Sequence, residues 1–149
     1  MPNRRTHTEV GAITGVATAL FLAKGQPTAF FLAEAAGGLL GGALGGIAPD
    51  VLEPATSPNH RKLAHSLVTA GTLTLARVTE WQSDCRRQAT ARAHAALTCL
   101  PGSRERSDAE LAAVAWSFLA GFIAGCFAGY ASHLALDSMT TRSLPLLGL

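Results

Sequence analysis

Four apolar stretches divide the chain, and polar residues are concentrated between them. The stretches are Val10–Ala23, Ala29–Ala48, Leu63–Ala76 and Leu111–Leu136. Glycine and proline punctuate the gaps, and no segment shows the sustained alternation of apolar and polar positions that is typical of a half-buried strand. A helix needs about 20 apolar residues to cross about 30 Å of hydrocarbon. The second and fourth stretches reach that length alone, and the other two reach it with their flanks. We therefore predict an all-α fold: one integral membrane domain, over residues 1–149, of about four helices.

A more polar segment, Trp81–Glu110, separates the third and fourth stretches. It contains five arginines and four acidic residues, and Glu80 directly precedes it, so we predict a solvated connection of about thirty residues. Its part Asp84–Leu100 can form an amphipathic helix that lies on a surface. The alternative is an exposed linker helix without such a contact.

Glycines recur at a fixed spacing inside the second apolar stretch. In GGLLGGALGG, residues 37–46, two sets of glycines each repeat every four residues. This spacing lets the backbone of a neighbouring helix approach closely. A phosphate-binding loop is excluded because no Gly-Lys-Ser/Thr follows and no strand precedes. The pattern therefore predicts tight helix packing.

Composition supports a membrane protein and argues against some partners. Charged residues make up 15% of the chain, against about 25% in a typical soluble domain. The net charge of +2 is small and the basic residues form no stripe with aromatics, so we expect no nucleic-acid partner. The basic N-terminus followed by an apolar run is also typical of a signal peptide. Because His7 and Glu9 stand at the edge of this run and Lys24 follows it, we interpret it as a retained membrane segment.

The three cysteines do not suggest a thiolate metal site. Cys85, Cys99 and Cys126 are scattered and form no Cys-x-x-Cys pair. Cys85 and Cys99 would be able to pair in an oxidising compartment, but we expect free thiols.

Polar residues able to bind metal stand at one end of every apolar stretch. One precedes the first stretch, one follows the second, two begin the third and two end the fourth. If the helices alternate in direction, all of these ends lie on one face of the bundle. The residues concerned are His7, Asp50, His60, His65, His133 and Asp137. Any one of them alone is more often a cap or a surface residue than a ligand, so the prediction of a site rests on their convergence.

The spacing of these residues indicates a divalent-metal site. His133 and Asp137 are four residues apart, about 40° around a helix, and so share a face. His60 and His65 share a site only if a helix begins between them. Imidazole and carboxylate without thiolate suit zinc, with manganese as the harder alternative. Such an ion acidifies water for hydrolysis. We assign catalysis to Asp50, His65 and Arg61, whose guanidinium is suited to an anionic substrate group.

Three segments of the chain resemble a known family. They are GGLLGGALGGIAPD, SPNHRKLAHSL and GYASHLALDSMTTRSLPLL, and an early Thr-His pair at residues 6–7 precedes them. In this order they are similar to the membrane-bound metal-dependent hydrolase family, an inner-membrane group described as LexA-binding hydrolases. The matching elements cover about half of the chain.

The resemblance implies an integral helical membrane protein with a divalent-metal site. Its motifs carry over to the following positions: His7, Asp50, His60, Arg61, His65, Ser66, His133 and Asp137. The chain departs from the family pattern twice. Leu52 stands where the family has a second aspartate after Pro-Asp, and Ala64 stands where threonine is usual.

We expect a multi-pass protein of the bacterial inner membrane with the site facing the cytoplasm. The short segments on the site face are basic, as the positive-inside rule requires, although the five arginines of the polar connection lie on the other face. The basic residues of the site face are Arg4, Arg5, Arg61, Lys62 and Arg142.

Three functions fit these features, and all involve membrane lipid as the surroundings. The first is a metal-dependent hydrolase that acts on a lipid-like or phosphorylated small molecule. The second is a non-catalytic membrane protein that binds a regulator or another partner protein. The third is a small ion or proton transporter, since ionisable residues within membrane segments are functional candidates.

Overall fold

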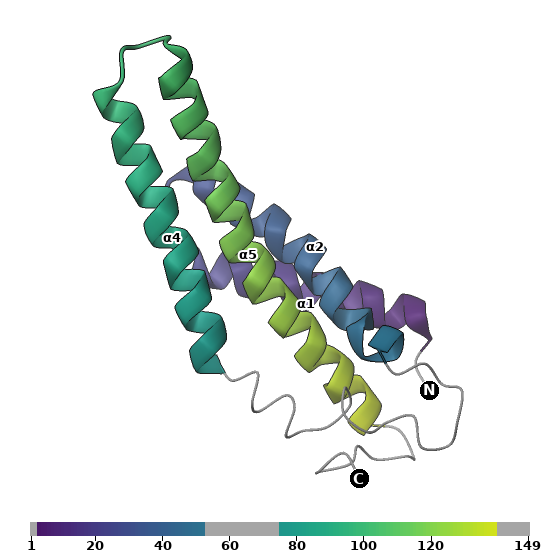
Figure 1. Cartoon of the computed structure of the whole chain (residues 1–149). Coiled ribbons are helices and arrows are strands. Elements are labelled where there is room, and N and C mark those ends of the chain that lie inside the picture. Colours follow the sequence, from purple (N-terminus) through teal and green to yellow (C-terminus); the bar gives the residue numbers. More distant parts are fainter. Residues whose placement is uncertain (1–2, 53–74, 140–149) are drawn as a thin grey trace.

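The computed structural model describes residues 3–52 and 75–139, and every regular element in these ranges is an α-helix. The prediction of an all-α fold is confirmed. Residues 53–74, with nearly all of the predicted third apolar stretch, lie outside the described ranges. The helices are α1 (Arg4–Leu22), α2 (Thr28–Leu52), α4 (Leu75–Thr98) and α5 (Arg104–Ser138) (Figure 1).

Local signals set the ends of these helices. The Asn3 side chain accepts a hydrogen bond of 2.9 Å from a first-turn amide of α1, and Ser103 caps α5 in the same way at 3.2 Å. Such caps satisfy amides that lack a partner within the helix. Two glycines with positive φ make the tight reversals, Gly25 (+88°) after α1 and Gly102 (+78°) before α5. As a result, α1 is antiparallel to α2 and α4 is antiparallel to α5.

Helix α2 packs between α1 and α5 through its two rows of glycines. A Cβ at Gly42 would overlap the carbonyl oxygen of Gly11 in α1, and one at Gly41 would overlap that of Phe122 in α5. No larger residue fits at either position without moving a backbone. The close packing predicted from the glycine spacing is therefore confirmed, and it holds three helices in a fixed register.

The polar segment contains the helix predicted within Asp84–Leu100, which is part of a longer helix that packs on α5. Most of it belongs to two long helices, since α4 ends at Thr98 and α5 begins at Arg104. The described part of α4 packs along α5 and buries four residues at helical spacing: Gln82, Cys85, Ala89 and Ala96. This narrow stripe of mostly small side chains is enough to dock the helix. The tip of the α4–α5 hairpin extends beyond α1 and α2 (Figure 1).

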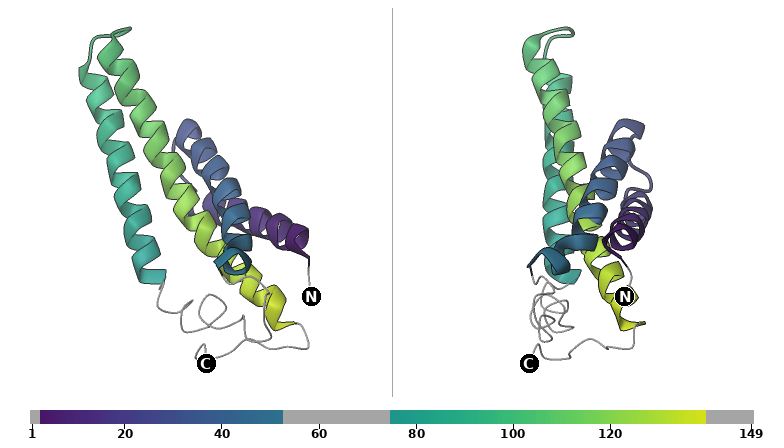
Figure 2. Two further views of the ribbon diagram at one scale, coloured as in Figure 1. Left: turned by 45° about the vertical axis from the view of Figure 1, so that its right-hand side comes forward. Right: turned by 90° about the vertical axis from the view of Figure 1, so that its right-hand side faces the viewer.

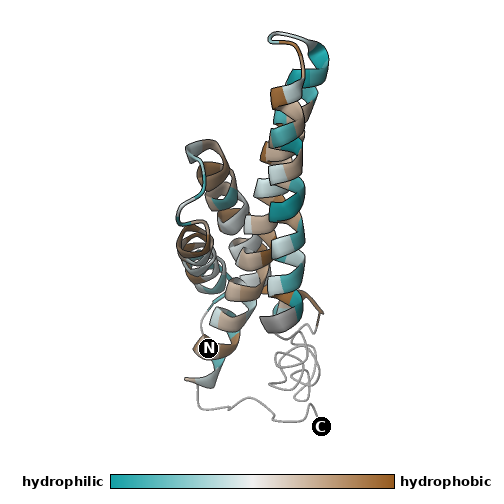
Figure 3. Cartoon of the chain, turned by 90° about the vertical axis from the view of Figure 1, so that its left-hand side faces the viewer, coloured by the Kyte–Doolittle hydropathy of each residue, from teal (hydrophilic) through white to brown (hydrophobic). Residues whose placement is uncertain are grey.

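Two of the described helices, α2 and α5, are long and apolar enough to cross a membrane. Helix α4 is much more hydrophilic, as Figure 3 shows with α4 facing the viewer. The chain thus pairs an apolar core helix, α5, with a polar neighbour along much of its length.

The cysteines are free thiols, as expected. Cys85 faces α5 and is only 5% exposed. Desolvation raises the pKa of the Cys85 thiol, and the negative charge of Asp84 raises it further. Cys85 is therefore a packing residue with low thiolate content at neutral pH.

Candidate metal centre

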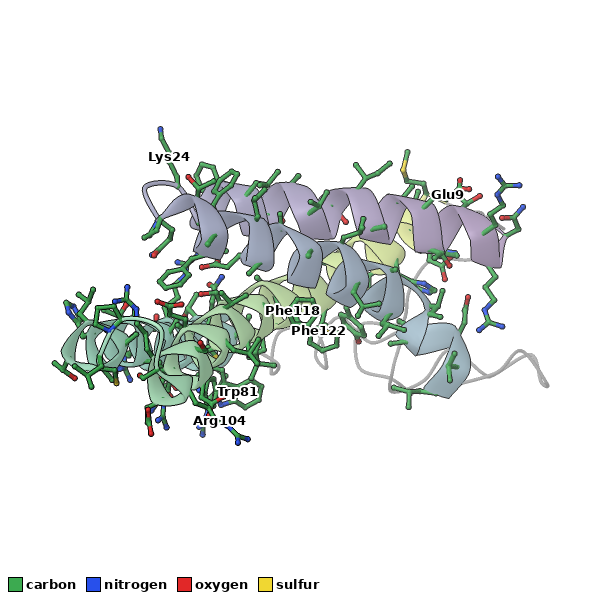
Figure 4. The ribbon with its side chains drawn as sticks, turned by 90° about the horizontal axis from the view of Figure 1, so that it is seen from above. Glu9, Lys24, Trp81, Arg104, Phe118 and Phe122 are labelled. Atoms are coloured by element: carbon green, nitrogen blue, oxygen red, sulfur yellow. The ribbon has the colours of Figure 1, made fainter. Side chains whose placement is uncertain are left out.

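The predicted residues that the structure describes meet at one end of the bundle. His7 lies in the first turns of α1, Asp50 lies near the end of α2, and His133 and Asp137 lie near the end of α5. These three ends come together in both views of Figure 2, and Figure 4 places the labelled Glu9 at this end and Lys24 at the other. The convergence follows from the alternating helix directions, as the sequence indicates.

Two buried histidines form the centre of the cluster. The rings of His7 and His133 stack with their centroids 3.9 Å apart and their planes 27° apart. His7 is 2% exposed and His133 is 0% exposed. The two rings therefore lie side by side in the interior of the bundle, and imidazole nitrogen is a common metal ligand.

The hydrogen bond of His133 orients its ring. His133 Nδ1–H donates to the carbonyl oxygen of Gly46 at a nitrogen–oxygen distance of 2.7 Å. A carbonyl oxygen only accepts, so Nδ1 carries the proton and the neutral ring has its lone pair on Nε2. Histidine ligands of metal ions commonly donate their second nitrogen to a carbonyl in this way.

Two carboxylates face the histidine Nε2 atoms. Asp137 lies 3.6 Å from His7 Nε2 through Oδ1 and 3.7 Å from His133 Nε2 through Oδ2. Asp50 Oδ1 lies 3.7 Å from His133 Nε2. These distances exceed those of hydrogen bonds between nitrogen and oxygen, about 2.7–3.2 Å. The nitrogen and oxygen atoms are instead spaced like the ligand atoms that surround one metal ion.

The donor set fits a divalent cation. One ligand atom each of His7, Asp50 and His133 lie within 4.8 Å of one another. Zinc binds imidazole nitrogen and carboxylate oxygen at about 2.0–2.2 Å, which places neighbouring ligand atoms about 3.3 Å apart in a tetrahedron. The nitrogen–oxygen separations of 3.6–3.7 Å are a few tenths of an ångström larger, and no pair within the His7, Asp50 and His133 set exceeds 4.8 Å, so side-chain shifts of about an ångström bring the ligands to an ion. Manganese suits the same donors.

Asp50 owes its position to the end of α2. Pro49 lies inside the helix, buried, where its ring cannot donate a backbone hydrogen bond. The last turns of α2 bend away from the rest of the helix (Figure 2). Asp50 follows directly and is 36% exposed at its side chain, whereas Asp137 is 1% exposed. Asp50 is therefore the acidic member of the cluster that solvent reaches.

Four of the predicted site residues are not described by the structure. His60, Arg61, His65 and Ser66 lie outside the described residues, so their roles stay predictions. Leu52, at the family's second acidic position, lies in the last turn of α2 with 71% exposure. Among the described residues, the cluster thus has one acidic residue from the Pro-Asp motif.

Glu34 lies away from the cluster, as its sequence position indicates. It is 1% exposed and accepts two hydrogen bonds from Arg86 of α4, at 2.9 Å from Nε and 2.5 Å from Nη2. The sequence did not reveal this partner, because Arg86 stands in the segment predicted to be a solvated connection. The sequence also did not reveal the Gly46 carbonyl as the acceptor for His133, because every residue has a backbone carbonyl and the pattern of side chains does not show which one accepts.

A comparison with family models gives one match. The model described as YdjM inner membrane protein matches residues 1–148. No curated protein and no solved structure is significantly similar to the chain. The match covers the apolar helices and the His/Asp cluster together. The chain belongs to the YdjM inner membrane protein family.

Proposed function

We propose that this chain is a multi-pass membrane hydrolase that depends on a divalent metal and acts on a lipid-like or phosphorylated substrate. The observation that carries the proposal is the orientation of His133, whose Nδ1–H donates to the Gly46 carbonyl while Nε2 faces two carboxylates. Two carboxylate oxygens at 3.7 Å from Nε2 of a ring held in place through Nδ1 have the arrangement expected of ligands around one cation.

The residues of the cluster divide into two groups by exposure. His7, His133 and Asp137 are buried and form the rigid part of the ligand set. Asp50 is partly exposed and stands at the mouth. Catalytic metal sites keep a position open to water or substrate, whereas structural sites are closed. The difference in exposure supports a site with an opening beside Asp50.

A divalent cation bound here supplies Lewis-acid activation of water or of a substrate oxygen. Asp50 is placed to accept the proton of the attacking water, because its carboxylate reaches both solvent and the His133 side of the cluster. His7 and His133 hold the ligand geometry through their stacked rings. Arg61 and His65 join this mechanism as sequence predictions, Arg61 to hold an anionic group and His65 as a further ligand and catalytic residue.

The location of the cluster supports the substrate class. It lies at the ends of α2 and α5, the two helices apolar enough to cross a membrane. A substrate that reaches it is therefore at the membrane edge, where lipid head groups and water-soluble phosphate esters are both present. Exposed Arg4 and Arg5 lie at the same end, which supports a cytoplasmic orientation of the site.

The test is a hydrolysis screen with the full chain purified in detergent. Zinc or manganese is added, and phosphate monoesters, phosphate diesters and glycerolipids are offered. We expect turnover of at least one substrate by the wild type, and none by His133→Ala. Asp50→Asn is expected to lower kcat about a hundredfold or more, the typical contribution of a general base. Metal-loaded wild type that turns over no substrate of these classes would contradict the proposal and favour a protein that binds a regulator.

A further inference from the structure

A groove lies between α1, α4 and α5. Its volume is about 830 Å³, which is within the usual range for ligand sites, about 300–1,000 Å³. Helix α1 lines one side from Val10 to Leu22, and the part of α5 from Ala124 to Met139 lines another. None of the described residues that line the groove is charged. We call this space the lateral groove, and its lining suits the uncharged part of a ligand.

The side-chain amide of Gln82 belongs to this lining. Gln82 reaches the lateral groove from α4 and is only 4% exposed. Its Nε2 makes no hydrogen bond within the described part of the chain. Buried polar side chains in native proteins nearly always have a hydrogen-bond partner, because desolvation without one is unfavourable. The amide of Gln82 therefore indicates a ligand in the groove that offers an oxygen acceptor.

Two other polar side chains of the groove have partners in their own helices. Thr14 Oγ1 donates to the carbonyl oxygen of Val10 at 2.9 Å, and Ser132 Oγ donates to that of Gly129 at 2.8 Å. An ordered water is a poor partner for Gln82 in such surroundings, since a buried water needs about two to four polar neighbours. The groove is therefore matched to an apolar molecule that carries an oxygen acceptor. In a membrane, lipid is the abundant molecule of this kind.

Gln82 lies one turn closer to the His/Asp cluster than the pair of Glu34 and Arg86. Helices α4 and α5 are antiparallel, and the backbone of Glu34 touches the position of Gly121 in α5. Gln82 precedes Arg86 by four residues, which places it about level with Gly125. Side chains of a helix lean toward its start, which for α4 is the cluster end. The Gln82 amide therefore lies nearer to the cluster than its backbone does.

The apolar stretch of α1 is short for a bilayer. Val10–Ala23 contains fourteen residues, about 21 Å of helix, against about 30 Å of hydrocarbon. Local thinning of the bilayer accommodates such a helix and brings the ester carbonyls of the lipids deeper. The positions of Gly125 and Gly15 both touch the carbonyl oxygen of Gly38, so Gly15 is at a similar level, about 8 Å inside the stretch. The Gln82 amide is therefore close to the depth of lipid esters on the cluster side.

We propose that the lateral groove binds an acyl chain of a membrane glycerolipid, and that Gln82 Nε2–H donates to the carbonyl oxygen of the ester of this chain. The site rests on the proposed multi-pass arrangement of the helices and does not depend on hydrolase activity of the His/Asp cluster. The hydrogen bond distinguishes this lipid from the surrounding lipids, which cover apolar surfaces with their chains alone.

A comparison of ester and ether lipids tests the hydrogen bond. The full chain is stripped of lipid in detergent and titrated with dioleoyl phosphatidylcholine or with its diether analogue, which lacks both carbonyl oxygens. Native mass spectrometry counts the lipids that are retained. We expect the wild type to bind the ester lipid about fivefold more tightly, the typical contribution of one hydrogen bond. Equal affinity for the two lipids would overturn the proposal, and this comparison requires no variant.

Substitutions on α4 test whether the preference comes from Gln82. Gln82→Leu should bind the two lipids equally, since leucine is of similar size and lacks the amide. Gln88 is exposed on the same helix, so Gln88→Leu is the matched control and should keep the preference of the wild type. A preference for the ester that survives Gln82→Leu would mean that another group donates the hydrogen bond, and the proposal would fail.

Filling the groove tests its position. Ala131 lines the groove and is exposed, whereas Ala115 is exposed on the same helix outside the groove. Ala131→Trp should displace the lipid and remove the preference for the ester, and Ala115→Trp should change neither. If Ala131→Trp changed only the oligomeric state, the groove would hold a second copy of the chain instead of lipid. Lipid binding without any hydrolysis would support this site and count against the proposed hydrolase.

Discussion

The bundle buries an acidic side chain towards each end, and the two have different surroundings. Glu34 meets the planar fork of Arg86 in two direct hydrogen bonds of 2.9 and 2.5 Å, so one cation matches one anion. Asp137 instead lies 3.6 and 3.7 Å from two imidazole nitrogens, in a cluster that includes Asp50. Both acids are about 1% exposed. Burial alone therefore does not distinguish a structural acid from a candidate metal ligand, whereas the type and spacing of the neighbouring atoms do.

The largest expected effect comes from breaking the Glu34 pair. Arg86→Leu leaves the Glu34 carboxylate buried without its cation, which should cost about 3 kcal/mol of stability. The double variant Glu34→Leu with Arg86→Leu removes both charges and should recover most of this loss, since apolar replacement of a buried pair is often neutral. Thermal unfolding in detergent measures both. If the double variant were as unstable as the single one, the pair would not be a simple structural contact.

The next effect concerns the metal. His133→Ala removes the ring that Gly46 orients and should weaken zinc binding more than about a hundredfold, beyond the effect of losing an outer-shell contact. Competition with a chromophoric chelator gives the affinity. The Glu34→Leu/Arg86→Leu variant is the matched control, and its affinity should equal that of the wild type. Equal losses in both variants would mean that metal binding reports only on general folding.

A smaller effect should follow from moving the Gly46 carbonyl. A Cβ at Gly46 would overlap the His7 carbonyl oxygen, whereas one at Gly37 would overlap that of Phe118 near the other end. Both Gly46→Ala and Gly37→Ala should disturb helix packing. Only Gly46→Ala should weaken metal binding, by about tenfold, because it shifts the acceptor of His133 Nδ1–H. Isothermal titration with zinc compares them, and an unchanged affinity in Gly46→Ala would count against the role of this carbonyl.

The smallest effect concerns Cys85, next to Arg86. Burial raises the pKa of the Cys85 thiol, so its thiolate fraction at neutral pH is below that of an exposed cysteine. Alkylation by maleimide at pH 7 should be slower at Cys85 than at the partly exposed Cys99, on the order of tenfold. The rate at Cys85 should rise with pH as the thiol ionises. Similar rates at both cysteines would indicate that the α4–α5 contact is open to water.

The sequence predicted the apolar helices and the meeting of His7, Asp50, His133 and Asp137. The length of each apolar stretch and the alternating direction of successive helices follow from the sequence alone. Together they predict which helix ends share a face of the bundle, without knowledge of side-chain contacts. The close packing of α2 was also predictable from its two rows of glycines, because glycine at this spacing lets the backbones of neighbouring helices approach closely. A helix was predicted over Asp84–Leu100, but its start at Leu75 and its packing on α5 were missed, because its buried stripe is narrow and the arginines around it dominate the composition of the segment.

The partners of the two buried acids were also beyond sequence reasoning. Arg86 has the same local pattern as the exposed Arg87 next to it, and only the packing of α4 on α5 turns one inward. The Gly46 carbonyl that orients His133 belongs to the backbone. Such contacts depend on tertiary geometry, so a prediction from spacing names the ligands but not the groups that hold them in place.

Elemental analysis of the full chain, purified in detergent without chelators, decides whether the His/Asp cluster holds a metal ion. We expect about one zinc or manganese ion per chain in the wild type and in Glu34→Leu/Arg86→Leu, and a large loss of metal in Asp137→Ala. Wild type without bound metal after incubation with zinc and manganese, or an undiminished metal content in Asp137→Ala, would contradict it.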